Sequence, residues 1–207
     1  MGIDYSLYLV ADTEFAAGRD LPALVSSAVE GGATVVQLRS KGLPLRDVLE
    51  LAAWISGRLD GTGVPLLVND RVDVSLACGA AGVHLGQEDM PVPAARKILG
   101  AGRIIGVSVN TEKEAREAEA QGADYVGLGP VFPTSTKETG LAVVGTEGVA
   151  QIKRALGIPV VAIGGITAAN APEIARAGAD GIAVVSAILG APDARAAAAK
   201  LRAAFGR

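Results

Sequence analysis

The sequence is poor in cysteine, histidine and aromatic residues. Cys78 is the single cysteine and His84 the single histidine among 207 residues, and aromatic residues make up 3%. A lone cysteine excludes an internal disulfide, so we expect Cys78, which lies in an apolar run, to be a small core residue. His84 also lies in an apolar run, with no second histidine or cysteine nearby, which argues against a zinc site. We expect His84 to be a neutral, hydrogen-bonded core residue, with catalysis as the alternative.

Basic clusters and long apolar runs are also lacking. The formal net charge is −3, and no cluster of lysine and arginine provides the basic face typical of nucleic-acid binding. No run is long enough to span a membrane, and the N-terminus lacks the basic start and long apolar core of a signal peptide. We therefore expect a cytoplasmic protein without nucleic-acid or membrane partners. The sequence does not give the oligomeric state, and a homodimer stays open.

The remaining composition favours one large aliphatic core. Half of the residues are hydrophobic and 20% are charged, and short runs of Val, Ile and Leu alternate with longer amphipathic stretches. The expected strands are residues 5–10, 34–38, 65–68, 82–85, 104–107, 125–128, 159–163 and 181–185. The expected helices include residues 21–30, 45–59, 111–121, 172–177 and 193–205. Eight strand–helix units favour an α/β fold with a single (β/α)8 TIM barrel over residues 1–207, rather than a flavodoxin-like open sheet.

Polar groups follow nearly every expected strand, at the end of a barrel where catalytic residues lie. After the second strand, alternation places Gln37, Arg39 and Lys41 on one face. Two cations that project together can hold a diphosphate, the arginine as a two-pronged donor and the lysine as a point charge. A solvated loop of mixed charge is the alternative interpretation.

Two aspartates follow the third and fourth strands. Asp70 and Asp89 would meet at neighbouring strand ends, and carboxylates in that position suit Mg²⁺, which binds one or two carboxylates together with substrate phosphate oxygens. The alternative is that Asp70 is the N-cap of a helix at 71–77 and that Asp89 is an N-cap before Pro91.

The later strands are followed by groups suited to phosphate. Ser108 follows the fifth strand, where it could contact a ligand, and Asn110 or Thr111 could cap the next helix. The loop at 129–137 after the sixth strand carries three hydroxyls and a lysine, which is typical of a mobile anion-binding loop. Gly164 and Gly165 after the seventh strand, with Ser186 after the eighth, form a pattern common in barrel phosphate sites.

These groups, in this order, resemble the thiamine phosphate synthase (thiamine-phosphate pyrophosphorylase) family. The matching pieces are QLRSK at 37–41, VNDR at 68–71, VHLGQED at 83–89, GVS at 106–108, GLGPVFPTSTK at 127–137, AIGGI at 162–166 and VVS at 184–186. The last two are shared by many phosphate-binding barrels, whereas QLRSK, VNDR and GPVFPTSTK together are specific. The match runs from the second strand to the eighth, which is nearly the whole chain.

The resemblance implies a reaction and a site. The family joins a pyrimidine methyl diphosphate to a thiazole phosphate carboxylate and yields thiamine monophosphate, diphosphate and CO₂. The residues implied for the pyrimidine diphosphate are Gln37, Leu38, Arg39, Ser40, Lys41, Asn69 and Ser108. Those implied for the thiazole phosphate are Thr134, Ser135, Thr136, Lys137, Gly165, Val185 and Ser186, with Lys137 also reaching the diphosphate. Asp70 and Asp89 would hold the cofactor Mg²⁺, and Arg39, Lys41, Ser108 and Lys137 would be the catalytic residues.

One position departs from the family pattern, which often has His two residues after the serine of GVS, where this chain has Asn110. Elementary chemistry agrees with the implied reaction: the charge that develops on a leaving diphosphate can be neutralised by Mg²⁺, Arg39, Lys41 and Lys137, and the electron-rich pyrimidine can support a carbocation-like methylene. Three alternatives stay open: the related thiazole tautomerase, a phosphate-sugar isomerase or epimerase, and a non-catalytic ligand-binding relative. The two acidic groups and QLRSK argue against the tautomerase.

Overall fold

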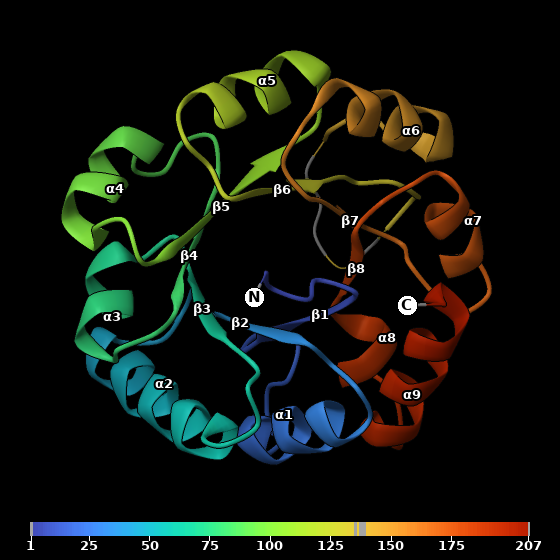
Figure 1. The fold of residues 1–207 in the computed structure, drawn as a ribbon. Helices are drawn as coiled ribbons and strands as arrows, with labels where there is room; N and C mark the ends of the chain where they lie inside the picture. Colours follow the sequence, from blue (N-terminus) through green and yellow to red (C-terminus); the bar gives the residue numbers. More distant parts are fainter. Residues whose placement is uncertain (1, 135, 137–139, 207) are drawn as a thin grey trace.

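The structure, a computed structural model, describes residues 2–134, 136 and 140–206. Its parallel strands form a closed barrel in the order β1 to β8, each strand paired with its neighbours in sequence and β8 paired with β1 (Figure 1). The strands are β1 (Leu7–Asp12), β2 (Val35–Arg39), β3 (Leu66–Asn69), β4 (Gly82–Leu85), β5 (Ile104–Val109), β6 (Tyr125–Leu128), β7 (Val160–Ile163) and β8 (Gly181–Val184). The predicted (β/α)8 barrel is confirmed.

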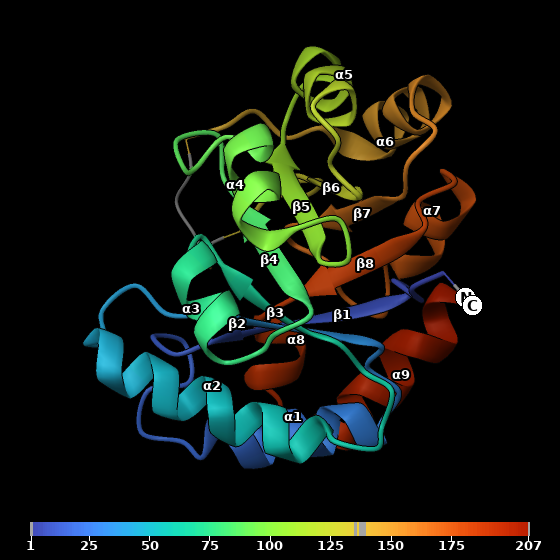
Figure 2. The same ribbon diagram turned by 60° about the vertical axis from the view of Figure 1, so that its left-hand side comes forward.

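Helices surround the barrel and bury its outer face (Figures 1 and 2). They are α1 (Leu21–Glu30), α2 (Leu45–Leu59), α3 (Val72–Ala77), α4 (Val92–Leu99), α5 (Glu112–Ala120), α6 (Gly145–Ala155), α7 (Ala171–Arg176), α8 (Ser186–Leu189) and α9 (Ala194–Phe205). The helices turn small and branched residues inward, such as Val25 and Ala28 of α1, and these pack with strand residues in one aliphatic core. Cys78 is half-buried and packs against that core.

The barrel interior holds a second, smaller cluster. Tyr5, Tyr8 and Tyr125 lie in it together with aliphatic residues of β1, β2, β3, β7 and β8. Three of the few aromatic residues of the chain therefore lie inside the barrel rather than between the strands and the helices. This interior cluster forms the floor beneath the strand ends that carry the polar groups.

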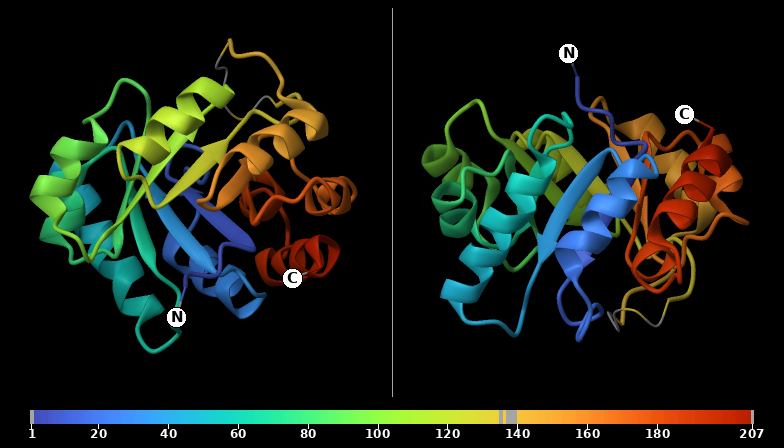
Figure 3. Two further views of the ribbon diagram at one scale, coloured as in Figure 1. Left: turned by 45° about the horizontal axis from the view of Figure 1, so that its top comes forward. Right: turned by 90° about the horizontal axis from the view of Figure 1, so that it is seen from below.

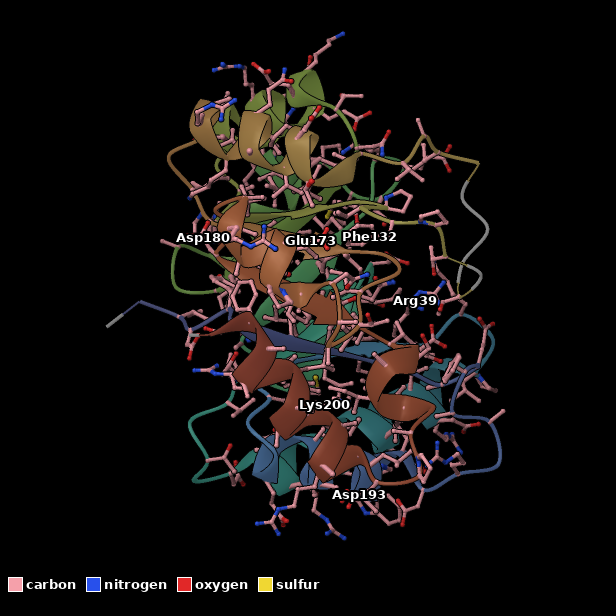
Figure 4. All side chains as sticks on the ribbon, turned by 90° about the vertical axis from the view of Figure 1, so that its right-hand side faces the viewer. Arg39, Phe132, Glu173, Asp180, Asp193 and Lys200 are labelled. Atoms are coloured by element: carbon pink, nitrogen blue, oxygen red, sulfur yellow. The ribbon has the colours of Figure 1, made fainter. Side chains whose placement is uncertain are left out.

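The two ends of the barrel differ in role. The two termini lie at the same end of the barrel, the end where the strands begin (Figures 2 and 3), and Arg202 of α9 bonds Asp4 there at 3.0 Å. Figure 4 places Asp180, just before β8, at this end and Arg39, the last residue of β2, at the opposite one. The polar groups that follow the strands therefore gather at the end away from the termini, as in other barrels of this kind.

The predicted elements agree with the structure apart from their bounds. The largest difference is in the first strand, which was expected at 5–10 and lies at Leu7–Asp12, so its last residue is a carboxylate at the catalytic end. No helix in the described part of the chain is long and apolar enough to cross a membrane.

Candidate active site

A cavity of about 210 Å³ opens at the carboxyl ends of the strands. Strand alternation builds it, because every second residue of a barrel strand points inward. The predicted site residues that line it are Gln37, Arg39, Asn69, Ser108, Thr134, Thr136, Gly165, Val185 and Ser186. Groups that the sequence placed after six different strands are thus brought around a single cavity.

Arg39 is held in place by a carboxylate from β1. Asp12 and Arg39 are paired in the register of β1 and β2, and their side chains form an ion pair. The other oxygen of Asp12 accepts the backbone N–H groups of Glu14 and Phe15 at 2.9 and 3.0 Å, which fixes the carboxylate. Asp12 therefore orients the guanidinium at the cavity wall, and the Arg39 side chain keeps 18% of its surface exposed.

Lys41, Asp70 and Asp89 form a second charged group beside the cavity. The Lys41 ammonium is ion-paired with Asp70, and Asp89 lies close enough to Asp70 to share a hydrogen bond with it. Burial, together with the neighbouring Asp70 carboxylate, raises the pKa of Asp89, and the N–H of Gly86, which donates to it at 2.7 Å, offsets part of that rise. Two carboxylates that repel each other, with a cation already on one of them, are suited to a divalent metal ion.

The helix-cap interpretation of these two aspartates is wrong. In the described chain α3 has Arg71 at its N-cap and α4 has Pro91 there, so neither Asp70 nor Asp89 occupies a cap position. Asp70 is also the one non-glycine residue of the described chain with a positive φ, at 61°. Its N–H donates to the carbonyl of His84 at 2.8 Å, which ties the end of β3 to β4. Strained backbone of this kind is concentrated at functional sites.

A chain of polar side chains crosses the cavity floor. Gln37 Nε2 donates to the Tyr8 hydroxyl at 2.6 Å, and the Tyr8 and Tyr125 hydroxyls lie 2.8 Å apart. His84 Nδ1 lies 2.8 Å from the Tyr125 hydroxyl, and His84 Nε2 lies 2.8 Å from Ser108 Oγ. His84 is hydrogen-bonded, as expected of a core histidine, yet it also lines the cavity.

The opposite wall of the cavity is formed by the β6 and β7 loops and the start of α8. Thr136 and Ser186 hydroxyls lie 3.4 Å apart, which brings the β6 loop to the first residue of α8. Gly165 has a positive φ of 65°, and a Cβ there would lie 2.5 Å from the carbonyl oxygen of Pro133, so the two loops meet only because this residue is glycine. Ser135 and Lys137, predicted for the same loop, lie outside the described residues.

Asn110 joins both ends of the β6 loop. Its side-chain amide donates to the carbonyl of Gly129 at 3.1 Å, where the loop begins, and to that of Ala142 at 3.0 Å, near its end. The capping role falls instead to Thr111, which forms a capping box with Glu114 at the start of α5. The residue that departs from the family pattern thus positions the loop.

One predicted contact, Leu38, faces away from the cavity. Leu38 is 1% exposed and packs in the core on the helix side of β2, because alternation turns it away from Gln37 and Arg39. The Ser40 hydroxyl is buried, and among the described residues it has no hydrogen-bond partner. Conversely, the sequence did not single out Tyr8, Asp12 or Tyr125, which all line the cavity. Alternate residues of a strand face the same side, so Tyr8 and Asp12 face the cavity together. The sequence would have indicated this if the first strand had been expected to end at Asp12.

These features define a class of protein, the (β/α)8 enzymes that act on phosphorylated small molecules. The barrel mouth has two cations, two adjoining carboxylates, and a separate group of glycine and hydroxyl residues. Comparison with known proteins narrows this class. The family model described as "Thiamine monophosphate synthase" matches residues 7–188. The thiamine-phosphate synthase of Chloroflexus aurantiacus is 49% identical over 97% of this chain and 93% of its own length. That of Syntrophomonas wolfei is 50% identical over 96% of this chain and 95% of its own length.

A solved structure gives the same result. Thiamine phosphate pyrophosphorylase from Pyrococcus furiosus superposes with a TM-score of 0.90 and 42% identity, covering 98% of this chain and 96% of its own. The chain belongs to the thiamine monophosphate synthase family. The resemblance carried by the sequence motifs is confirmed.

Proposed function

We propose that this protein is a thiamine-phosphate synthase. It would join 4-amino-2-methyl-5-(diphosphooxymethyl)pyrimidine to a thiazole phosphate carboxylate and release thiamine monophosphate, diphosphate and CO₂. The observation that carries the proposal is that one cavity has two separate groups suited to phosphate: Arg39 on one wall, with Lys41 beside the cavity, and the Gly165 and Ser186 group on the other wall. A single-phosphate substrate would need only one of them.

The two groups suggest a division of the cavity into half-sites. The pyrimidine diphosphate would lie over Gln37, Asn69 and Ser108, with its phosphates toward Arg39 in the cavity wall and Lys41 beside the cavity. The thiazole phosphate would lie against the β6 loop, Gly165, Val185 and Ser186. Leu38 would act only through the shape of β2, whereas Ser40 stays a predicted contact.

Asp70 and Asp89 fit a bound Mg²⁺. Among the residues described, no group of three or more His, Cys, Asp or Glu is placed to hold a metal by itself. Mg²⁺ is usually held by one or two carboxylates and completed by substrate phosphate oxygens, so the pair suffices when the diphosphate is present. Bound there, the ion would neutralise negative charge on the leaving diphosphate. The ion pair of Lys41 with Asp70 supports the proposal, because it places a positive charge next to this carboxylate.

The chain's own residues would act by position and charge. The C–O bond between the pyrimidine methylene and the diphosphate breaks, and its electron pair leaves with the diphosphate, which Arg39, Lys41 and Lys137 stabilise. The thiazole nitrogen lone pair then forms the C–N bond to the carbocation-like methylene. Loss of CO₂ leaves an electron pair on the ring carbon, which takes a proton from water. This sequence needs no protein nucleophile, and the work of the site is to orient two substrates and exclude water.

Lys137 provides the test of this proposal. Thiamine monophosphate formation is measured with both substrates, with and without Mg²⁺, for the parent and for Lys137→Ala. We expect the parent to require Mg²⁺, and Lys137→Ala to lower turnover far more than it weakens pyrimidine diphosphate binding. Release of hydroxymethyl-pyrimidine, the product of capture by water, should rise in the variant.

The control removes the same charge elsewhere. Lys97→Ala, at an exposed position on α4, should leave turnover unchanged. A parent that forms no thiamine monophosphate would support the tautomerase or binding-protein alternative, and normal turnover of Lys137→Ala would contradict the role of this lysine. A cytoplasmic location and a homodimeric state stay predictions.

A further inference from the structure

The hydrogen-bond chain on the cavity floor joins two proposed pyrimidine contacts through three residues to which no role has been given. Gln37 and Ser108 form its ends, and Tyr8, Tyr125 and His84 lie between them. Tyr8 and Tyr125 are 1% and 0% exposed, and His84 is 9% exposed. The three central groups are thus shielded from water, whereas Ser108 is exposed on an otherwise largely buried strand.

Two glycines make the chain possible. In the register of the sheet, Gly106 of β5 lies between His84 of β4 and Tyr125 of β6. A Cβ on Gly106 would lie 2.1 Å from the Tyr125 ring, so the histidine and the tyrosine meet across β5 only because that strand has no side chain there. Gly127, the partner of Ser108, leaves room for the His84 ring in the same way, since its Cβ would lie 2.9 Å from Cε1.

The hydrogen bonds from Gln37 to Ser108 all run in one donor-to-acceptor direction. An amide N–H can only donate, so the Tyr8 oxygen accepts from Gln37. The Tyr8 hydrogen then has an acceptor among these groups only if it is directed to the Tyr125 oxygen, 2.8 Å away. The Tyr125 hydrogen is then directed to His84 Nδ1, which must be the unprotonated ring nitrogen. Burial raises the pKa of both tyrosines, so both hydroxyls keep their hydrogens. The His84 hydrogen is left on Nε2, which donates to Ser108 Oγ.

We propose that Tyr8, Tyr125 and His84 are positioning residues that fix the Nε2–H tautomer of His84 and thereby leave the Ser108 hydroxyl to donate its hydrogen into the cavity. The opposite tautomer would make Ser108 donate to His84 and present only an acceptor to the ligand. A ligand ring at Ser108 must accordingly offer an acceptor, such as a ring nitrogen of an aminopyrimidine. The pyrimidine part of this proposal rests on the half-sites proposed above, but the tautomer does not.

The tautomer can be measured directly, because His84 is the only histidine. With ¹⁵N-histidine labelling, the NMR spectrum of the whole protein contains one pair of imidazole nitrogens and needs no assignment. We expect Nε2 to carry the proton in the unliganded parent, at a pH about two units above the ordinary histidine pKa of about 6.5. Protonation on Nδ1, or a mixture of both tautomers, would overturn the proposal whatever the activity of the enzyme.

Two variants test the link to substrate. Tyr125→Phe removes the hydroxyl that faces Nδ1, so we expect a mixture of tautomers and a rise of roughly 3- to 10-fold in KM for the pyrimidine diphosphate, with KM for the thiazole phosphate unchanged. Tyr8→Phe should act in the same direction and serves if Tyr125→Phe does not fold. The matched control is Tyr5→Phe. The Tyr5 ring packs 4.7 Å from that of Tyr125, but the Tyr5 hydroxyl is not among the groups that join Gln37 to Ser108. Equal effects in the control and in Tyr125→Phe, or an unchanged tautomer in both test variants, would contradict the proposal.

Discussion

At the scale of single residues, the site is organised by pairs rather than by individual groups. Arg39 lies against Asp12, and Lys41 lies against Asp70. An ion pair of this kind orients a cation while leaving the remaining N–H groups of a guanidinium for a ligand. Asp12 was absent from the sequence-based prediction because the first strand was expected to end at Val10, two residues short of its actual end.

Arg39→Ala should weaken pyrimidine diphosphate binding by about 2–3 kcal/mol, roughly 30- to 150-fold, because a charge-assisted two-pronged contact is lost. Thiazole phosphate binding should change little. Arg39→Lys should recover only part of the loss, since an ammonium cannot replace the planar donor pair. Isothermal titration with each ligand separately measures both affinities.

The control is Arg46→Ala, which removes the same charge from an exposed position on α2 and should affect neither ligand. Equal losses for the two ligands in Arg39→Ala would mean that the arginine is structural or that the half-sites are wrongly divided.

At the scale of elements, the loop after β6 depends on its neighbours. Asn110 holds both ends of it, and the N–H groups of Val144 and Gly145 bond back to the carbonyls of Pro130 and Val131 at 2.9 and 3.1 Å. The loop therefore leaves and re-enters the barrel at one place. The composition of the loop predicted that it binds phosphate. Its two ends, however, are held together by contacts between residues more than 30 positions apart, which composition does not reveal.

Asn110→Ala should raise KM for the thiazole phosphate by roughly 3- to 30-fold, because two hydrogen bonds that position the loop are lost. KM for the pyrimidine diphosphate should stay near that of the parent. Asn110→His, the residue that the family often has here, can donate to one carbonyl and should give an intermediate value.

Thr111→Ala is the matched control at the adjacent position. It breaks the capping box of α5 and should lower the free energy of unfolding by about 1 kcal/mol without changing either KM. The idea that Asn110 positions the loop fails if both variants show the same kinetic change.

At the scale of the whole molecule, barrel closure concentrates like charges. Asp70 and Asp89 come from different strand ends, and the register of β3 with β4 places them together at the site. Their proximity costs stability in the absence of a cation, since two neighbouring carboxylates oppose each other's ionisation. A metal ion that binds the folded state and not the unfolded state would raise the free energy of unfolding by mass action.

Mg²⁺ with inorganic diphosphate should therefore raise Tm of the parent, by roughly 2–4 °C for each kcal/mol of binding free energy. Asp89→Asn should lose this rise while its Tm without metal stays equal to that of the parent or increases slightly, because a repulsion is removed and the amide oxygen can still accept from Gly86. Differential scanning calorimetry measures both.

Asp47→Asn, in the exposed first turn of α2, is the control and should keep the full response to Mg²⁺. A normal response in Asp89→Asn would show that this carboxylate is not a metal ligand.

The barrel and most of the cavity wall could be predicted from the amino-acid sequence alone. Buried parallel strands must be apolar on both faces, so their runs are visible along the chain, and the polar residues that follow them lie at one end of a barrel. That reasoning placed Gln37, Arg39 and Ser108 correctly, whereas Leu38 was included with its motif although alternation turns it outward.

How these residues are paired could not be predicted, because it depends on the packing of separate elements. The Asp12 to Arg39 ion pair, the bridge of Asn110 to Ala142 and the chain from Gln37 to Ser108 each join residues from separate elements. Such contacts depend on the register between strands and on the absence of a side chain at Gly106 and Gly127. Register is a property of two segments packed together, so neither segment specifies it alone.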